Sequence, residues 1–421
     1  MNKKYLTITI IVLILIGFGI FMYTPKPKIQ IISVGENITN QQPSLENNLV
    51  DANNQLALDL YSRYKLEDKN IFFSSYSISS ALAMTYEGAR GQTAEEMKAV
   101  LHLPEDKNKI RSDFAKIYNE LNSADKSYKL TTANALWSQE DYSFIDEYFN
   151  VVGESYYGKA TNLNFKTDAE NSRITINDWV ESNTNNKIKD LIPSGALGSD
   201  TKLVLTNAVY FKANWSNKFE AEDTWDGKFK LNSGKDVNAR MMYKTSSYNY
   251  GETDEFQILE IDYLGNELSM LVILPKDNNL NKVENDLSKD NLEKWKKNMQ
   301  TEEVKVTLPK FKFEAKYFMA EDLKEMGMPS AFDENIADFT GMSTKGDLYI
   351  DEVIHQTFIE VAEYGTEAAA ATAVIMLSTT AMPPEEQPKI FNVNHPFIFI
   401  IQQKDSGNIL FMGRVNDPTQ E

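Results

Sequence analysis

Side chains that could carry out catalysis or hold a metal ion are scarce in this sequence. The 421 residues include no cysteine and only three histidines, His102, His355 and His395, which lie far apart along the chain. Without cysteine there can be no disulfide, thiolate zinc site, iron–sulfur cluster or catalytic thiol. The sequence also lacks the motifs of a nucleophile elbow, a zinc protease, a phosphate-binding loop and a dinucleotide-binding loop. We therefore predict no catalytic residue, no metal site and no cofactor, and we expect that the protein is not an enzyme.

The charge balance excludes a further class of function. Asp and Glu outnumber Lys and Arg, and the formal net charge is −18. Recognition of phosphates needs a basic face, so we expect no nucleic-acid partner. Hydrophobic residues make up 42% of the chain and charged residues 25%, which is ordinary for a globular protein with a sizeable core.

One segment near the C-terminus stands out because it is long, nearly uncharged and rich in small residues. Residues 363–384 read EYGTEAAAATAVIMLSTTAMPP, and Glu367 is the only charge after Glu363. The four alanines at 368–371 favour a helix, whereas Val374 and Ile375 favour a strand. The residues alone leave both conformations open.

An extended conformation would give this segment two distinct faces. Alternate residues of a strand share a face, so Thr366 would begin a face that is uncharged and mostly small. Gly365 and Glu367 would lie on the opposite face. A strand of this kind could enter a crowded sheet above an apolar core.

The N-terminus contains a candidate membrane segment. Residues 5–23 form nineteen consecutive uncharged positions, which at about 1.5 Å per residue can cross a bilayer core of about 30 Å. A cleaved signal peptide is the alternative, but residues 22–25 read MYTP, which is a poor cleavage site. We favour an uncleaved anchor over residues 1–24, with Lys3 and Lys4 inside and the rest of the chain outside the cytoplasm, or secreted if the segment is cleaved.

The rest of the chain is expected to form one domain. Residues 25–50 are polar, contain three prolines and read as a linker, whereas 51–421 show no Pro/Gly/Ser-rich break. Apolar residues at helical spacing predict helices near 56–64 and 78–86. Apolar and alternating runs predict strands at residues 203–211, 268–274, 304–308, 397–402 and 409–415. We therefore expect a mixed α+β domain.

The order of short motifs from residue 53 to the C-terminus resembles the serpins, a family of serine protease inhibitors. The matching motifs are NIFFSSYSI at 70–78, ALAM at 81–84, GARGQT at 88–93, TNAVYFKANWSNKF at 206–219, LPKF at 308–311, MGM at 326–328, ADF at 337–339, HPF at 395–397 and FMGRVNDP at 411–418. Each motif is weak alone, but their common order and spacing are specific.

The resemblance implies a fold and a mechanism. Serpins have three β-sheets, eight or nine helices and an exposed reactive-centre loop that serves as bait. A target protease cleaves the loop and is trapped as an acyl-enzyme while the loop inserts as a new strand into the main sheet. The residues that match the hinge of inhibitory members are Glu363, Gly365, Thr366, Glu367, Ala368, Ala369, Ala370 and Ala371. We expect this loop, Thr366 included, to be exposed before cleavage.

The resemblance also assigns residues to the region where the sheet opens. Ser74, Ser77, Asn207 and His355 match the shutter, a polar cluster beneath the sheet, and Trp215 matches the breach, where insertion begins. Their expected role is conformational rather than catalytic. Ser75 departs from the family pattern, which commonly has proline there.

Counting along the loop predicts the cleaved bond. In inhibitory serpins the hinge glutamate lies sixteen residues before the residue that precedes the cut, which from Glu363 gives the bond Thr379–Thr380. Such a small residue suits an elastase- or subtilisin-type protease rather than a trypsin-like one. A shift of the register toward Met376, Leu377 or Met382 would instead expose a chymotrypsin-like site. Residues 382–390 make the C-terminal side of the loop several residues longer than usual.

Two functions remain after these observations. The first is a membrane-anchored, monomeric suicide inhibitor of serine proteases, with a cysteine protease as a further target class. The alternative is a non-inhibitory serpin-like binding or chaperone protein, which would be cleaved without trapping a protease.

Overall fold

The strand predicted at residues 203–211 is the central strand of the main sheet. The computed structural model describes residues 48–366 and 387–420, and within them strand β4 spans Leu203–Asn214. All but two of its residues are buried, as expected for a strand that is covered on both faces. Its sheet runs in the order β10 (Phe311–Phe318), β11 (Glu352–Ala362), β12 (Gly365–Thr366), β4, β2 (Tyr128–Gln139) and β3 (Lys159–Leu163).

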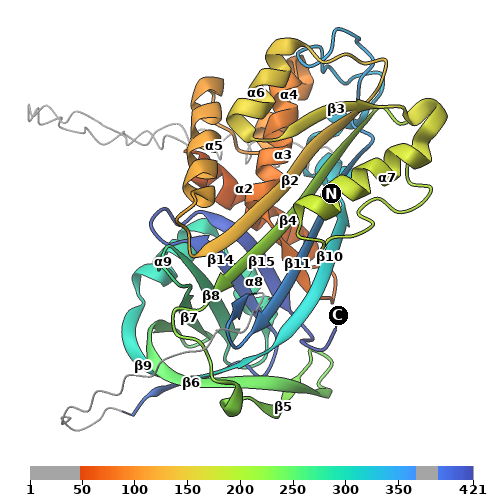
Figure 1. Ribbon diagram of the computed structural model, residues 1–421. Coiled ribbons are helices and arrows are strands. Elements are labelled where there is room, and N and C mark those ends of the chain that lie inside the picture. The colour runs from red at the N-terminus through yellow and green to blue at the C-terminus, as the bar shows by residue number, and fades with distance from the viewer. Residues whose placement is uncertain (1–47, 367–386, 421) are drawn as a thin grey trace, which may run out of the picture. The chain divides into compact units, whose positions relative to one another are not determined.

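Helices cover both faces of this sheet (Figure 1). On one face, helix α7 (Phe165–Asn183) packs Phe165, Ile176 and Val180 against Trp137 of the sheet. On the other face, helix α3 (Ser75–Gly88) lies in the main core and is buried along its whole length. The sheet is therefore the middle layer between two apolar cores.

A second group of strands forms a nine-stranded sheet. Its order is β1 (Ile71–Phe73), β15 (Ile409–Val415), β14 (Phe397–Gln403), β8 (Leu268–Pro275), β7 (Phe256–Asp262), β6 (Asp236–Glu252), β9 (Gln300–Pro309) and β13 (Lys389–Asn392), with β5 (Trp225–Lys230) beside β6. The long strand β6 pairs with β9 through residues 241–250 and with β7 only through residues 249–252. That short pairing joins two of the three expected sheets into one continuous ladder.

The helices agree in number with the expected fold. The described residues contain nine α-helices, and those not yet introduced are α2 (Leu49–Tyr64), α4 (Gly91–Val100), α5 (Lys107–Asn122), α6 (Asp146–Tyr156), α8 (Leu280–Asp286), α9 (Lys289–Lys297) and α10 (Ala320–Met326). Two short 3₁₀ helices span Ala221–Asp223 and Pro329–Phe332. The predicted α+β serpin-type fold is confirmed.

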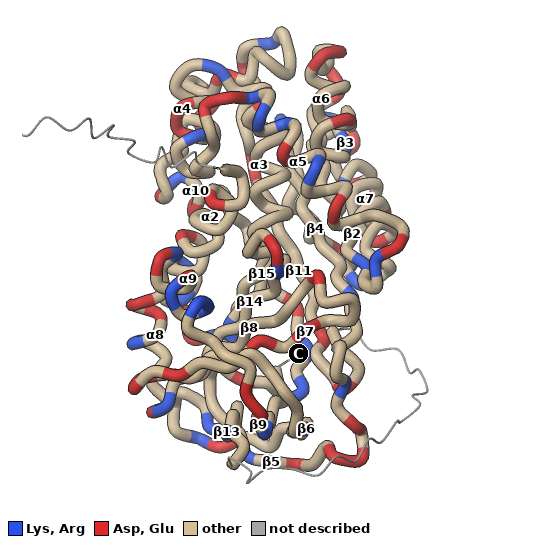
Figure 2. The backbone as a smooth tube through the Cα atoms, turned by 90° about the vertical axis from the view of Figure 1, so that its left-hand side faces the viewer, with Lys and Arg blue, Asp and Glu red and all other residues tan. Residues whose placement is uncertain are grey.

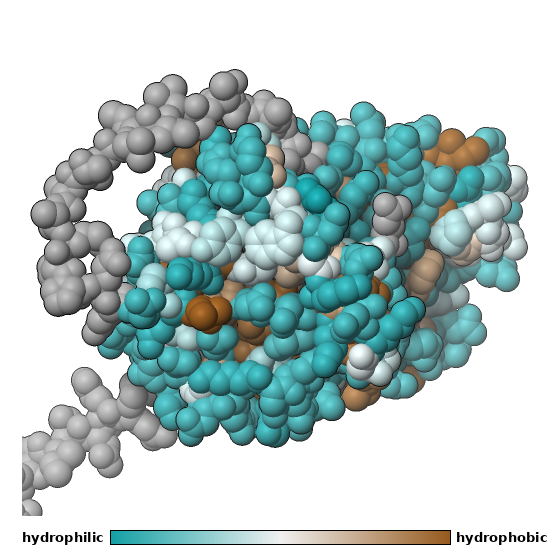
Figure 3. Space-filling view, turned by 90° about the horizontal axis from the view of Figure 1, so that it is seen from below, coloured by the Kyte–Doolittle hydropathy of each residue, from teal (hydrophilic) through white to brown (hydrophobic). Residues whose placement is uncertain are grey.

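The surface carries no large single-sign or apolar region in the views shown. Lys and Arg are interspersed with Asp and Glu on α4, α8 and α9 (Figure 2). The face near β5 and β6 is mostly hydrophilic, with scattered hydrophobic groups (Figure 3). Within residues 48–366 and 387–420, no helix has the length and apolarity needed to cross a bilayer. The predicted segment at 5–23 and most of the linker at 25–50 lie outside the described residues.

Candidate functional site: the split between β4 and β11

Strands β4 and β11 are paired at one end and separated at the other. Residues 352–357 of β11 pair in parallel with residues 204–209 of β4. Further along, the two-residue strand β12 lies between them, with Thr366 opposite both Val361 and Ala213. The main sheet is therefore already split at the end where β12 enters (Figure 1).

A tight turn at Glu363 and Tyr364 leads from β11 into β12. The Glu363 carboxylate accepts hydrogen bonds from Lys310 Nζ at 2.8 Å and Thr224 Oγ1 at 3.0 Å. Burial opposes ionisation of Glu363, but the hydrogen bond from Lys310 and further bonds outweigh it, so the pKa of this carboxyl is lowered. Backbone bonds from Phe219 N to Glu363 O and from Trp215 N to Tyr364 O complete the attachment.

Gly365 is required by the close approach of β12 to β4. Its φ of +153° is rarely adopted by other residues. A Cβ at this position would overlap the carbonyl oxygen of Ala213 and lie 2.6 Å from the Cα of Asn214. Any side chain here would push β12 away from β4.

Thr366 is buried, which corrects the expectation that it is exposed before cleavage. Its side chain is 1% exposed, and its Oγ1 lies 2.7 Å from the Tyr263 hydroxyl. Tyr263 stacks on Trp215 with ring centroids 4.6 Å apart, and the Trp215 indole donates to Ala362 O at 3.0 Å. Thr366 faces inward, as predicted, but it occupies that position already because β12 pairs on both sides.

The predicted shutter residues lie together beneath the sheet. Asn207 and His355 are register partners across the paired end of β4 and β11. Ser74 caps the N-terminus of α3, and its Oγ accepts from Ser77 N at 3.2 Å. The Asn207 amide donates to Ser77 O at 2.8 Å, so the helix is attached to β4.

His355 is held in one tautomer by this cluster. Its Nε2 accepts from the Ser74 N–H at 3.1 Å, and therefore Nδ1 carries the proton and donates to Asn207 Oδ1. The imidazole is completely buried, and this burial lowers the pKa of His355 to about 3. A second proton on Nε2 would face an N–H donor, so the neutral ring is the form that fits.

Three partners in the site were not predicted from the sequence. Asn134 on β2 accepts from Ser77 Oγ at 3.0 Å and from Asn207, and Lys310 and Thr224 hold Glu363. Each comes from a distant part of the chain, and no local pattern distinguishes it. The departure at Ser75 has a local explanation, because its Oγ donates to Ile409 O at 2.8 Å, a bond that proline would not make.

The remaining predicted residues cannot be placed. Glu367 to Ala371 and the bond between Thr379 and Thr380 lie outside the described residues.

Comparisons with known proteins agree with this geometry. A family model described as "Serpin (serine protease inhibitor)" matches residues 51–418. An uncharacterized serpin-like protein of Thermococcus kodakarensis is 47% identical over 89% of this chain and 86% of its own length. Human leukocyte elastase inhibitor is 38% identical over 88% of this chain and 99% of its own length. The crystal structure of human thyroxine-binding globulin matches with a TM-score of 0.80 at 29% identity, over 88% of this chain and 98% of that one. The chain is a member of the serpin family.

Proposed function

We propose that this serpin inhibits serine proteases by inserting its cleaved loop between β4 and β11. The observation that carries the proposal is the position of β12, which already pairs with both strands. Extending its register would place Ala370 opposite Thr357 and Val209, and Thr372 opposite His355 and Asn207. The two antiparallel registers of β12 and the parallel register of β11 with β4 are mutually consistent, so one continuous strand fits.

The side chains expected along that strand suit the two cores. On the inward face, alternate positions from Thr366 through Val374 are Thr, Ala or Val, and they would contact buried residues such as Phe211 and Val353. On the outward face, Glu367 would lie beside Lys212 and Glu360, which are partly exposed. No charge would be buried between Ala368 and Ile375.

The chemistry of trapping follows from the predicted cut. The serine Oγ of the protease attacks the carbonyl carbon of Thr379, the bond to the Thr380 nitrogen breaks, and the Thr380 amine leaves with a proton. Thr379 is then esterified to the protease. Insertion of the loop before water hydrolyses this ester would move the protease and stop the second half of the reaction.

The experiment is incubation with an elastase- or subtilisin-type protease followed by denaturing electrophoresis. We expect a complex of about one-to-one stoichiometry that survives SDS, and a new N-terminus at Thr380. Cleavage without any stable complex would favour the alternative, a non-inhibitory binding protein. The similarity to thyroxine-binding globulin, a protein named for the ligand that it binds, supports this alternative.

We also propose that residues 5–23 anchor the protein in a membrane, with the serpin domain outside the cytoplasm. The support is the uncharged run without a convincing cleavage site. Fractionation and N-terminal sequencing of the native protein should find the intact chain with membranes. Soluble extracellular protein that begins after residue 20 would contradict the anchor.

A further inference from the structure

The last residue of β4 is an asparagine in a sequence that permits a covalent modification. Residues 214–216 read NWS, which fits the sequon of N-linked glycosylation, Asn-X-Ser/Thr with X other than proline. So short a pattern also occurs by chance, so the structure has to support it. Asn214 is exposed, whereas every other residue of β4 is buried or half-buried. The sequon therefore begins where the central strand of the main sheet reaches the surface.

The side chain of Asn214 faces away from the main core. Thr366 and its register partner Ala213 are both buried. Because successive residues of a strand face opposite sides, Asn214 and its own partner Gly365 face outward. Gly365 has no side chain, so β12 leaves the outward side next to Asn214 open. A sugar attached to the Asn214 amide would project into solvent without displacing β12.

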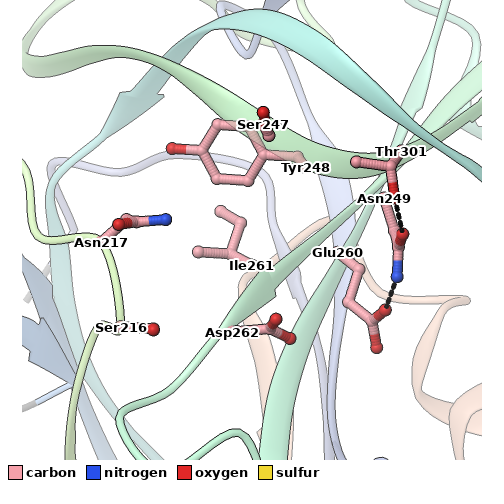
Figure 4. A pocket seen from close by; sticks show the side chains of 9 residues that line it. All are labelled: Ser216, Asn217, Ser247, Tyr248, Asn249, Glu260, Ile261, Asp262 and Thr301. Atoms are coloured by element: carbon pink, nitrogen blue, oxygen red, sulfur yellow. Dashed lines mark hydrogen bonds between the residues drawn. The ribbon is translucent and has the colours of Figure 1, made fainter. Parts of the chain in front are cut away.

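Neither polar side chain of the sequon holds the fold together. Among the residues that the structure describes, the Asn214 amide group and the Ser216 hydroxyl form no hydrogen bond. The local bonds are made by the backbone: Asn214 O accepts from Leu264 N at 2.7 Å, and Ser216 N donates to Asp262 O at 2.8 Å. Ser216 is exposed and lines a polar cavity of about 160 Å³ beside the segment that follows β4 (Figure 4). A sugar on Asn214 would therefore break no contact among the described residues.

The middle residue of the sequon limits when a sugar can be attached. Trp215 is only 3% exposed. Its backbone N–H donates to Tyr364 O at 2.8 Å, and its indole donates to Ala362 O at 3.0 Å. A transferase has to bind the three residues as an accessible chain, which these contacts prevent. Modification must therefore precede folding.

The order of the chain provides time for such a modification. The sequence separation between Trp215 and Ala362 is 147 residues. At about 5–20 residues per second, a ribosome needs roughly 7–30 s to make that interval. Until then the two carbonyl groups that bind Trp215 do not exist, and β4 lacks its partners β11 and β12. The sequon is accessible during this time.

We propose that Asn214 carries an N-linked oligosaccharide, which is added before the domain folds. The proposal rests on the extracytoplasmic placement proposed above, because this modification belongs to exported proteins. The donor is an oligosaccharide bound to a polyprenyl phosphate or diphosphate. Asn214 Nδ2 attacks the anomeric carbon of the sugar, and the bond from that carbon to the phosphate oxygen breaks. The lipid phosphate leaves with the bonding electrons, and Nδ2 gives up one proton to a base of the transferase.

The test is mass spectrometry of the native protein, purified from its source organism and digested with trypsin. Trypsin cuts after Lys212 and Lys218 and releases ANWSNK, which separates this sequon from the second one, NIT at residues 37–39. We expect ANWSNK to carry the mass of an oligosaccharide. Unmodified ANWSNK in protein recovered from outside the cytoplasm would overturn the proposal and leave the placement intact. Recovery of the native protein from the cytoplasm would contradict the placement and the proposal together.

Two matched variants, produced in the same organism, show whether the sequon directs the modification. Ser216→Ala removes the hydroxyl that the sequon requires, so the sugar should be lost although Asn214 is still present. Ser216→Thr retains a hydroxyl at that position, so the corresponding peptide should still carry the sugar. A sugar on Asn214 in Ser216→Ala, or its absence in Ser216→Thr, would refute the assignment.

Discussion

The substitution Ala370→Arg tests whether the cleaved loop inserts between β4 and β11 in the proposed register. In the proposed register, residue 370 would lie between Thr357 and Val209, both buried and both facing the main core. An arginine there would bring an unpaired charge into that core, which costs about 3–5 kcal/mol. Each ~1.4 kcal/mol added to a barrier slows a step about tenfold. Insertion past this point should therefore slow by about 10²-fold to several thousandfold.

The uncleaved variant should nevertheless be as stable as wild type. In the described structure Thr357 pairs directly with Val209, so the sheet is closed at this position. Thermal denaturation of the uncleaved protein should give the wild-type Tm. Reaction with an elastase- or subtilisin-type protease should instead give complete cleavage of the variant and little or no SDS-stable complex, because hydrolysis of the ester overtakes insertion.

Glu367→Arg is the matched control, since it introduces the same side chain on the opposite face. Its neighbours would be Lys212 and Glu360, which are partly exposed, so the effect on insertion should stay within about threefold. The reasoning fails if Ala370→Arg traps protease as efficiently as Glu367→Arg, or if both variants lose trapping equally.

Three further predictions concern the hinge, the cut and the polar cluster. Thr366→Arg should lower the Tm of the uncleaved protein, because Thr366 is buried against Tyr263; a wild-type melting curve would argue against that burial. Thr379→Arg should shift inhibition toward trypsin-like proteases, whose pocket carboxylate would pair with the new charge, and mass spectrometry should map the cut to the same bond. His355 ordinarily titrates near pH 6.5 but has a pKa of about 3 when folded. As the pH falls, His355 therefore takes up a proton in the unfolded chain before it does so in the folded protein. The free energy of unfolding should fall by about 1.4 kcal/mol per pH unit between pH 6.5 and the folded pKa of about 3. Urea titrations of His355→Gln should show a correspondingly smaller slope, and identical slopes would contradict the buried neutral imidazole.

Much of the fold follows from local sequence patterns. The predicted strand at 203–211 lies within β4, and the run at 409–415 matches β15 at both ends. Continuous burial in these strands requires long apolar runs, which are visible in the sequence. The alternation of Val304, Val306 and Leu308 likewise predicted the half-buried strand β9.

The parts that were missed depend on contacts between distant residues. The pairing of β6 with both β9 and β7 is a tertiary property, so the joining of two expected sheets could not be predicted. Asn134 and Lys310 have no distinguishing local pattern and gain their importance only from their partners Asn207 and Glu363. The inward orientation of the Thr366 side chain was predictable from the alternation of side chains along a strand. Its burial before cleavage was not, because it depends on β4 and β11 having already separated.

The most direct test of loop insertion is the structure of the protein after cleavage at its loop. The account predicts that residues 370–375 lie as a strand between β4 and β11, with Thr372 level with His355 and Asn207. Direct pairing of residues 352–357 with 204–209 must then be lost. A cleaved protein in which that pairing persists, with the loop outside the sheet, would contradict the proposed mechanism.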